Sequence, residues 1–375
     1  MSKKLAIFCD GTWSQASAER TNVVRLFEAL EPADKSKPPI PQLAFYGKGV
    51  GTRMEEKIRG GAFGYGISEN IKAAYSFIVS NFESGDEIFL FGFSRGAFTA
   101  RSVAGLIRNI GVLKREKMHL IDEGYDKYRD KAPEWAPDGV EAIAFRKANS
   151  HPDESIAFIG VWDTVGALGA PFGLIAGWIV DKIFHTSFHD TKLSSWVKSA
   201  YHALAVDERR WPFRPNPWEL NAEHRQRNAD AVKARKIPCY EQRWFPGVHS
   251  NVGGQYPNKG LADLALEWMA DRASHHGLNV DLSRIHEPEF KPDIMEDIEN
   301  SQTKFYQLAT KYFIYYPGKL SLVRRYVFPK DIRDLIGGVT SDGDYIRPID
   351  ASSDNIDTPR LKKEKDGAYR PPNIP

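Results

Sequence analysis

Apolar residues over the first 280 positions fall into two alternating kinds of segment. Short, nearly continuous apolar runs are typical of buried strands, and longer segments with apolar residues every three or four positions are typical of helices. The runs that predict strands cover residues 5–9, 43–46, 87–91, 155–162 and 238–245. The patterns that predict helices cover residues 22–30, 67–82, 97–110, 193–206 and 261–275. This alternation predicts a mostly parallel sheet with helices on both faces.

The third apolar run leads into the sequence GFSRG, residues 92–96, which fits the pattern G-x-S-x-G. With an apolar strand before it and a helix after it, this motif is typical of a nucleophile elbow. Its glycines remove side chains that would collide with neighbouring backbone at a strained turn. The turn places the serine hydroxyl near a helix N-terminus, which stabilises developing negative charge. The motif predicts that Ser94 is a nucleophile, and a plain strand-to-helix turn is the alternative.

A serine nucleophile needs a base, and the base needs an acid to orient it. In α/β-hydrolases these residues follow in the order serine, acid, histidine. Asp163 ends the next strong apolar run, and His249 follows the last run in a glycine-rich stretch, so both lie at the carboxyl edge of the predicted sheet. In the standard fold the acid follows the second strand after the strand that carries the nucleophile. Here the pattern predicts that Asp163 follows the first strand after it. Either a strand has been missed, or the acid comes one strand early.

Other residues compete for the two partner roles. Asp207 and Asp263 are the alternative acids. Among the histidines, His202 falls inside a predicted helix, where packing or capping explains it. His275 and His276 end another predicted helix, where a cation favours the helix dipole. We therefore favour His249 as the base and Asp163 as the acid.

Two glycine-containing stretches have both a functional and a structural interpretation. The apolar stretch 167–180 is either a lid or acyl-chain wall or an ordinary buried helix, and its length does not separate the two. His185 and His189 follow it and stay open as lid or substrate contacts. The stretch GGAFGYGISEN, residues 60–70, lacks the lysine and the spacing of phosphate-binding loops, which favours a structural loop.

Several stretches of this sequence occur together in one known family. They are IFCDGTW, GDEIFLFGFSRGAFTAR, VWDTVGALG, HALAVDERRWPF and WFPGVHSNVGGQYPNKGLADLALEWM. As a set they resemble the family of uncharacterised α/β-hydrolase domains. Its best-understood members are the first class of type VI secretion lipase effectors, bacterial phospholipases that attack the membranes of rival cells. The resemblance covers residues 5–273 and implies a catalytic triad of Ser94, Asp163 and His249.

The same patterns suggest how the chain is divided. Residues 114–150 carry a charged, helical pattern outside the alternation, and the periodicity weakens from residue 281 onward apart from the aromatic run TKYFIYYPG. We expect an α/β-hydrolase-like catalytic domain over residues 1–280, with helical insertions at about 114–150 and 167–192. We expect residues 281–375 to form a C-terminal extension that packs on or trails this core.

The first apolar run begins the stretch LAIFCDGTWS, in which a predicted strand ends at Asp10 and the turn follows. Haloacid-dehalogenase-type phosphatases present their catalytic aspartates in this way. That chemistry needs an aspartate two residues earlier, and Phe8 stands there, so a phosphatase would lack its nucleophile. We expect Asp10 to fix the turn by accepting local hydrogen bonds. An oxyanion in this site needs two backbone donors. We expect one from the amide of Arg95 and the other from the turn at Gly11 and Thr12.

Composition narrows the classes of function. The 375 residues include 51 basic and 49 acidic side chains, a balance that does not predict a nucleic-acid surface. Two cysteines, Cys9 and Cys239, leave no disulfide framework and no zinc spacing. For the proposed ester chemistry we expect no metal and no cofactor. The basic run 360–365 is typical of a solvated terminus.

The sequence also bears on location and partners. The apolar run after the N-terminal lysines is too short for a signal peptide, and no segment reaches the ~18 apolar residues of a membrane-spanning helix. We expect a protein that is cytoplasmic as synthesised, with leaderless export left open. The expected partners are an acyl-ester or phospholipid substrate, a transient membrane surface, and a secretion apparatus or immunity protein.

These observations favour a serine carboxylic ester hydrolase of the lipase or phospholipase type. The first alternative is an esterase or thioesterase that acts on small soluble substrates. The second is a non-catalytic interaction module on a hydrolase fold. An intact set of serine, aspartate and histidine favours the enzyme over the module.

Overall fold

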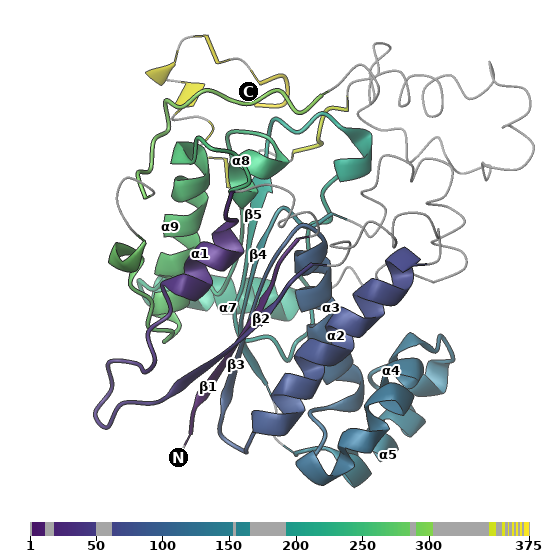
Figure 1. The fold of residues 1–375 in the computed structure, drawn as a ribbon. Coiled ribbons are helices and arrows are strands. Elements are labelled where there is room, and N and C mark those ends of the chain that lie inside the picture. Colours follow the sequence, from purple (N-terminus) through teal and green to yellow (C-terminus); the bar gives the residue numbers. More distant parts are fainter. Residues whose placement is uncertain are drawn as a thin grey trace, which may run out of the picture.

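Six parallel strands form the centre of the molecule (Figure 1). This computed structural model describes residues 2–11, 19–49, 62–152, 155–165, 193–285, 290–302 and 345–349, and parts of 355–374. The strand order is β2-β1-β3-β4-β5-β6, and each neighbouring pair is parallel. The strands are β1 (Lys4–Cys9), β2 (Gln42–Gly47), β3 (Glu87–Phe93), β4 (Ile156–Trp162), β5 (Ala200–Ala205) and β6 (Tyr240–Phe245). The predicted parallel sheet is confirmed.

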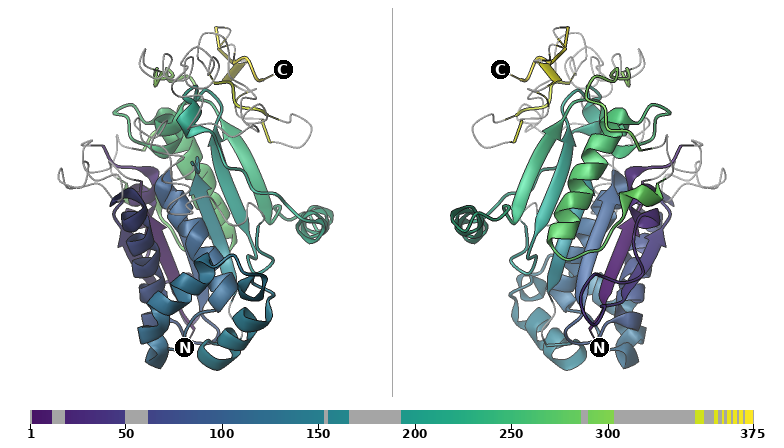
Figure 2. Two further views of the ribbon diagram at one scale, coloured as in Figure 1. Left: turned by 90° about the vertical axis from the view of Figure 1, so that its right-hand side faces the viewer. Right: turned by 90° about the vertical axis from the view of Figure 1, so that its left-hand side faces the viewer.

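Helices cover both faces of this sheet, as predicted. The helices α1 and α9 lie on one face, and α2 and α3 lie on the other, with α4 and α5 outside them (Figure 1). Their bounds are α1 (Asn22–Glu28), α2 (Ala62–Asn81), α3 (Arg95–Ile110), α4 (Ile121–Arg129), α5 (Val140–Asn149), α7 (Ala222–Lys233), α8 (His249–Gly253) and α9 (Gly260–His275). Helices α4 and α5 account for the helical insertion expected near residues 114–150. Helix α7 stands away from the sheet (Figure 2).

The side chains of β1 show why the strands have continuous apolar sequences. Leu5 and Ile7 belong to the apolar cluster on the α2 and α3 side, whereas Ala6 and Phe8 belong to the cluster on the α1 and α9 side. Successive side chains of a strand point to opposite faces, so a strand covered on both faces is apolar at every position. Phe8 also stacks on Phe91 of β3, with ring centroids 5.0 Å apart. The two clusters hold the carboxyl ends of the strands in fixed positions.

The prediction of a helix over residues 193–206 is wrong, because residues 200–205 form the strand β5. Three of these six residues are alanines, the strongest helix former, and all six are buried, so no alternation of polar and apolar positions marks the strand. Pairing with β4 and β6 outweighs the local helix preference. His202 therefore lies in a strand.

The described parts of the C-terminal region pack on the carboxyl ends of β5 and β6. Residues from both regions form a third apolar cluster, whose buried members are Leu204, Val206, Trp244, Ile356, Tyr369 and Ile374. The backbone of Asn355 also pairs with that of Arg243 in an isolated parallel bridge. Figure 1 shows the C-terminal pieces near β5 and α8. These described pieces therefore lie against the carboxyl end of the sheet.

Two expectations fall on segments outside the described residues. They are the apolar stretch 167–180 with the two histidines that follow it, and the aromatic run 310–318. Among the residues that the structure describes, no helix combines the length and the apolar content needed to cross a bilayer.

Candidate active site

Ser94 stands on a sharp turn between β3 and α3. Its φ and ψ angles are 58° and −121°, a strained combination that L-residues rarely adopt. The turn is fixed because the Ser94 amide donates to the Trp162 carbonyl over 3.1 Å. A Cβ atom on Gly92 would overlap the backbone of Gly96, and one on Gly96 would overlap the backbone of Cys9. The glycines therefore allow α3 to start directly against β1 and β3.

His249 reaches Ser94 from the other side of the site. It is the first residue of α8, which follows β6 after a short turn. Its Nε2 atom lies 2.9 Å from Ser94 Oγ, and its Nδ1 atom lies 2.6 Å from Asp163 Oδ2. The ring packs against Phe93 and Phe213, with centroids 4.6 and 4.9 Å away. The structure thus brings together the three side chains predicted from the strand ends.

Asp163 ends β4 with a left-handed backbone, φ 37°. Its Oδ1 atom accepts from the Ala205 amide at 3.0 Å and from Arg347 Nη1 at 2.5 Å. Its Oδ2 atom accepts from Arg347 Nη2 at 2.9 Å, in addition to the contact with His249. Burial raises the pKa of Asp163, but the charge of Arg347 and the hydrogen bonds from both partners outweigh it and hold this pKa well below its usual range. Asp163 is therefore a carboxylate.

The pKa of His249 is lowered from its usual value. Burial is the main cause, and the hydrogen bond and negative charge of Asp163 offset part of it. A neutral imidazole whose Nδ1–H donates to Asp163 presents an unprotonated Nε2 to the Ser94 hydroxyl. This is the protonation state that a general base requires.

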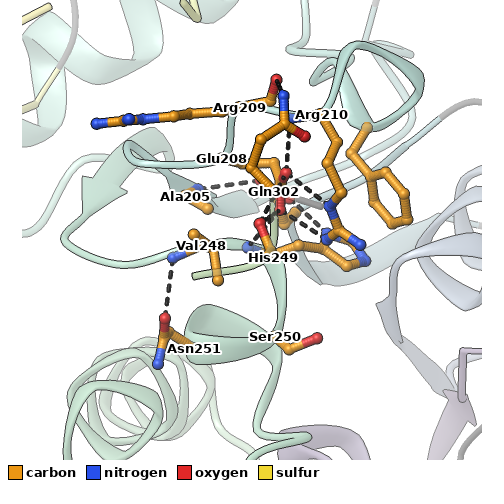
Figure 3. Close-up of polar contacts among 12 residues, drawn as sticks. Ala205, Glu208, Arg209, Arg210, Val248, His249, Ser250, Asn251 and Gln302 are labelled. Atoms are coloured by element: carbon orange, nitrogen blue, oxygen red, sulfur yellow. Dashed lines mark hydrogen bonds and ion pairs between the residues drawn. The ribbon is translucent and has the colours of Figure 1, made fainter. Parts of the chain in front are cut away.

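Glu208 is a second buried carboxylate beside His249. Figure 3 shows it between Arg210 and the backbone of His249. It accepts from the His249 amide at 3.2 Å and from Nε and Nη2 of Arg210 at 2.8 and 2.7 Å. Burial raises its pKa, and the hydrogen bond and charge of Arg210 outweigh burial and lower it. Glu208 therefore binds the start of α8 through backbone and does not contact the imidazole nitrogens.

The turn after β1 lies beside Ser94. A Cβ atom placed on Gly11 would be 3.4 Å from the Cβ of Ser94. Asp10 accepts from the Gly11 amide at 2.7 Å, from Thr21 Oγ1 and from Tyr46 Oη at 2.7 Å, so the expected local hydrogen bond is confirmed. Burial raises the pKa of Asp10, against the lowering effect of these bonds. In this conformation the Gly11 amide donates to Asp10.

The other expected donors are placed as follows. Arg95 is the first residue of α3, so its amide follows Ser94 at a helix N-terminus. Thr12 lies outside the described residues.

The competing acids are engaged elsewhere. Asp207 accepts from the Gly247 amide at 2.7 Å and from Tyr369 Oη at 3.0 Å. Asp263 forms a buried ion pair with Arg25 at 2.5 Å. Within the described part of the chain, Asp163 is the carboxylate that contacts the His249 ring.

The competing histidines also have structural contacts. His202 accepts the Thr164 amide at 3.1 Å, directly behind the turn that carries Asp163. Burial and the charge of Arg101 lower the pKa of His202 to about 3, so this ring is neutral. His276 bonds to Ser199 and Tyr201 at the start of β5, and His275 is an exposed residue at the end of α9. Within the described ranges no group of three or more His, Cys, Asp and Glu side chains is arranged to hold a metal ion.

The sequence leaves open whether the prediction lacks a strand or the acid comes one strand early, and the structure shows that a strand was lacking. The missed strand is β5, which follows Asp163 and lies between β4 and β6 in the sheet. Asp163 still ends the first strand after the nucleophile strand. Asp163 and His249 therefore converge across the end of β5, where the Ala205 amide supports the acid.

Two residues of the site were missed by sequence reasoning. Glu208 follows residues 193–206, which the pattern predicts as a helix, so the sequence does not place Glu208 after a strand. Arg347 lies in the sequence DYIRPID, which has no periodicity and no motif that links it to Asp163.

A parallel sheet with a nucleophile elbow and a contacting serine, histidine and aspartate at its carboxyl edge defines the α/β-hydrolase class. Within that class, the chain belongs to the family described as "T6SS, Phospholipase effector Tle1-like, catalytic domain", which matches residues 3–272. The family is thus one of hydrolases of the lipase and esterase type.

Similar proteins are found more widely. The chain is 29% identical over 234 residues to the uncharacterized protein YEL023C of Saccharomyces cerevisiae, covering 56% of this chain and 32% of that protein. A crystal structure of an uncharacterized protein from Pseudomonas aeruginosa shares 16% identity at a TM-score of 0.41, over 89% of this chain and 52% of that one. The Tle1 effector bound to the VgrG spike of the type 6 secretion system shares 18% identity at a TM-score of 0.35, over 68% and 52%. The chain thus spans about a third of the yeast protein and about half of these two solved chains.

Proposed function

We propose that this chain is a serine hydrolase that cleaves acyl esters, of the lipase or phospholipase type. The observation that carries the proposal is the continuous contact from Ser94 Oγ through both nitrogens of His249 to Asp163. Burial of all three side chains, together with the strained backbone at Ser94, supports it, because strain in such places accompanies function.

In the proposed reaction, Ser94 Oγ attacks the ester carbonyl while its proton passes to His249 Nε2. Asp163 holds the tautomer of the imidazole and stabilises the imidazolium that forms. The tetrahedral intermediate collapses to an acyl-serine when His249 returns the proton to the leaving alcohol. Water then attacks the acyl-serine by the same sequence of steps, with His249 again as base.

The negative charge of the tetrahedral oxygen needs two donors. We assign the first to the amide of Arg95, which lies at the N-terminal end of α3. The second comes from the turn at Gly11 and Thr12. For Gly11 to serve, its amide must exchange the bond to Asp10 for one to the substrate oxygen.

Family membership supports an acyl ester of a phospholipid as the substrate class. The apolar stretch 167–180, the candidate acyl-chain wall, lies outside the described residues, so short soluble esters and thioesters are the alternative substrates. The Tle1 effector has been seen on a VgrG spike, and a secretion-apparatus partner is proposed for this chain on the strength of the shared family. A non-catalytic role would not account for the contacts that join Ser94, His249 and Asp163.

The test is a panel of 4-nitrophenyl esters with acyl chains of two to twelve carbons, and phosphatidylethanolamine vesicles, given to wild type and Ser94→Ala. We expect ester turnover by wild type that Ser94→Ala lacks, with the highest kcat/KM on longer chains and release of fatty acid from vesicles. Turnover limited to short chains would favour a small-substrate esterase. No turnover of any ester by a folded wild type would contradict the proposal.

A further inference from the structure

Arg347 reaches the catalytic acid from far along the chain. It lies 184 positions after Asp163 and outside residues 3–272, the part that matches the family. We propose that Arg347 is a positioning residue for catalysis, which holds Asp163 in place and limits the basicity of His249. The C-terminal region therefore completes the site. This inference rests on the proposed triad.

Arg347 holds both oxygens of Asp163 with its two terminal nitrogens, the planar fork geometry that fixes a carboxylate most firmly. Nη1 also donates to the Ala205 carbonyl at 2.7 Å, and Nη2 donates to the Phe213 carbonyl at 2.5 Å. The fork is thus tied to the end of β5 and to the segment that packs on the His249 ring. Rotation of the Asp163 carboxylate would break bonds on both oxygens.

The backbone around Arg347 is anchored to the loop after β5. The Tyr345 amide donates to the Arg209 carbonyl at 2.9 Å, next to the carboxylate that holds the start of α8. Asn373 Nδ2 donates to the carbonyl of Arg347 at 3.1 Å and to that of Val206 at 3.3 Å. Backbone on both sides of the arginine is therefore fixed to the loop after β5. Arg347 itself is fully buried.

The charged and titratable groups that face His249 and Asp163 are Arg101, His202, Glu208, Arg210 and Arg347. Arg347 is the cation in direct contact with Asp163, so it neutralises much of the charge that would otherwise raise the pKa of His249. Its removal would leave the Asp163 carboxylate to act on the imidazolium alone, and the pKa of His249 would rise.

Two substitutions in the full chain separate orientation from charge. Arg347→Lys keeps the cation and loses the fork, and Arg347→Gln loses the cation. For 4-nitrophenyl butyrate, we expect Arg347→Lys to lower kcat by about 10- to 100-fold, with KM little changed and the acid limb of the pH profile in place. We expect Arg347→Gln to lower kcat near neutral pH and to move the acid limb of kcat/KM upward by about one pH unit. The rate of labelling by a fluorophosphonate probe should follow the same pH shift.

Arg25→Gln is the matched control, because Arg25 is a fully buried arginine paired with Asp263 outside the site. It should lower the melting temperature without moving the acid limb. If Arg347→Gln does not fold, Arg347→Lys still decides the matter through kcat. Folded Arg347 variants with wild-type kcat and wild-type pH profile would overturn the inference and leave the proposed function standing. A wild type that neither turns over esters nor labels would overturn the proposed function itself.

Discussion

The two ends of the proposed triad are built in different ways. The nucleophile end is mostly local: β3, the five-residue motif and the start of α3 position Ser94, and the contacts that require glycine lie within one turn of it or on the neighbouring strand. The Ser94 amide adds a hydrogen bond to Trp162 of the adjacent strand β4. The acid end is assembled from distant segments, because Asp163 is held by the end of β5, by α8 and by Arg347 from the C-terminal region. The nucleophile can therefore be read from a short sequence, whereas the acid depends on the completed fold.

Substitutions at the two ends should therefore differ in their effects on catalysis and on stability. Substitutions at the nucleophile end should change chemistry with little effect on folding. Substitutions at the acid end should change both, because its groups are buried and charged. Substitutions at the two ends, each with a matched control, test whether the effects separate in this way.

The largest effect is expected at the nucleophile. Ser94→Ala should lower kcat for aryl esters by about 10⁴-fold or more, because the reacting oxygen is lost. The melting temperature should stay within a few degrees of wild type, measured by differential scanning fluorimetry. Ser102→Ala, at a buried serine of the same helix, is the control and should keep its activity. Equal losses in both variants would show that the effect is structural.

The acid end should lose both activity and stability. Asp163→Asn should lower kcat by about 10⁴-fold through the wrong imidazole tautomer. It also leaves Arg347 buried without its counterion, which should cost about 3–5 kcal/mol in the free energy of unfolding. Urea unfolding measures the second effect.

Asp263→Asn serves as its control, since Asp263 is the acid of the buried pair with Arg25. It should destabilise the protein by a similar amount and keep kcat. If Asp163→Asn proved as stable as wild type, the contrast between the two ends would not hold.

The pH dependence tests the electrostatics of the acid end. Because the pKa of His249 is lowered, the acid limb of kcat/KM should lie below the usual histidine value of ~6.5, with activity falling about tenfold per pH unit beneath it. The folded pKa of Asp163 is depressed, so its contribution to stability is present above the unfolded value of ~3.9 and is lost as the pH falls further. Activity should therefore fall before the protein unfolds. An acid limb above pH 7 would contradict this.

The smallest effect is expected in the turn beside the nucleophile. Asp10→Asn replaces one of the carboxyl oxygens that accept from Gly11, Thr21 and Tyr46 with an NH₂ group, which should lower kcat by about 3- to 10-fold, the value of one such hydrogen bond. Labelling of Ser94 by a fluorophosphonate should persist. Asp34→Asn, which removes the partner of Lys4 away from the site, is the control. Abolished labelling in a folded Asp10→Asn would place Asp10 in the catalytic set.

The same contrast explains how far the sequence alone could lead. The elbow, the parallel sheet and the pairing of Ser94 with His249 and Asp163 were predictable, because each residue ends an apolar run and the ends of parallel strands converge. The strand β5 was not predictable, since it is buried on both faces and rich in alanine, a pattern that favours a helix. Because β5 was predicted to be helical, the position of Glu208 just after a strand end could not be predicted either.

Arg347 could not be predicted for another reason. Its role depends on a contact across 184 residues of chain, and no local preference of an arginine in a polar segment specifies one carboxylate as its partner. Long-range pairing of charges is a property of the folded molecule, whereas a motif such as the elbow is set by its own backbone.

The most direct test of the account is peptide mapping after labelling the full chain with a fluorophosphonate probe. The account predicts one adduct, on the peptide that contains Ser94, formed at a rate that falls as His249 becomes protonated. No adduct on a folded protein, or an adduct on another serine that persists in Ser94→Ala, would contradict it.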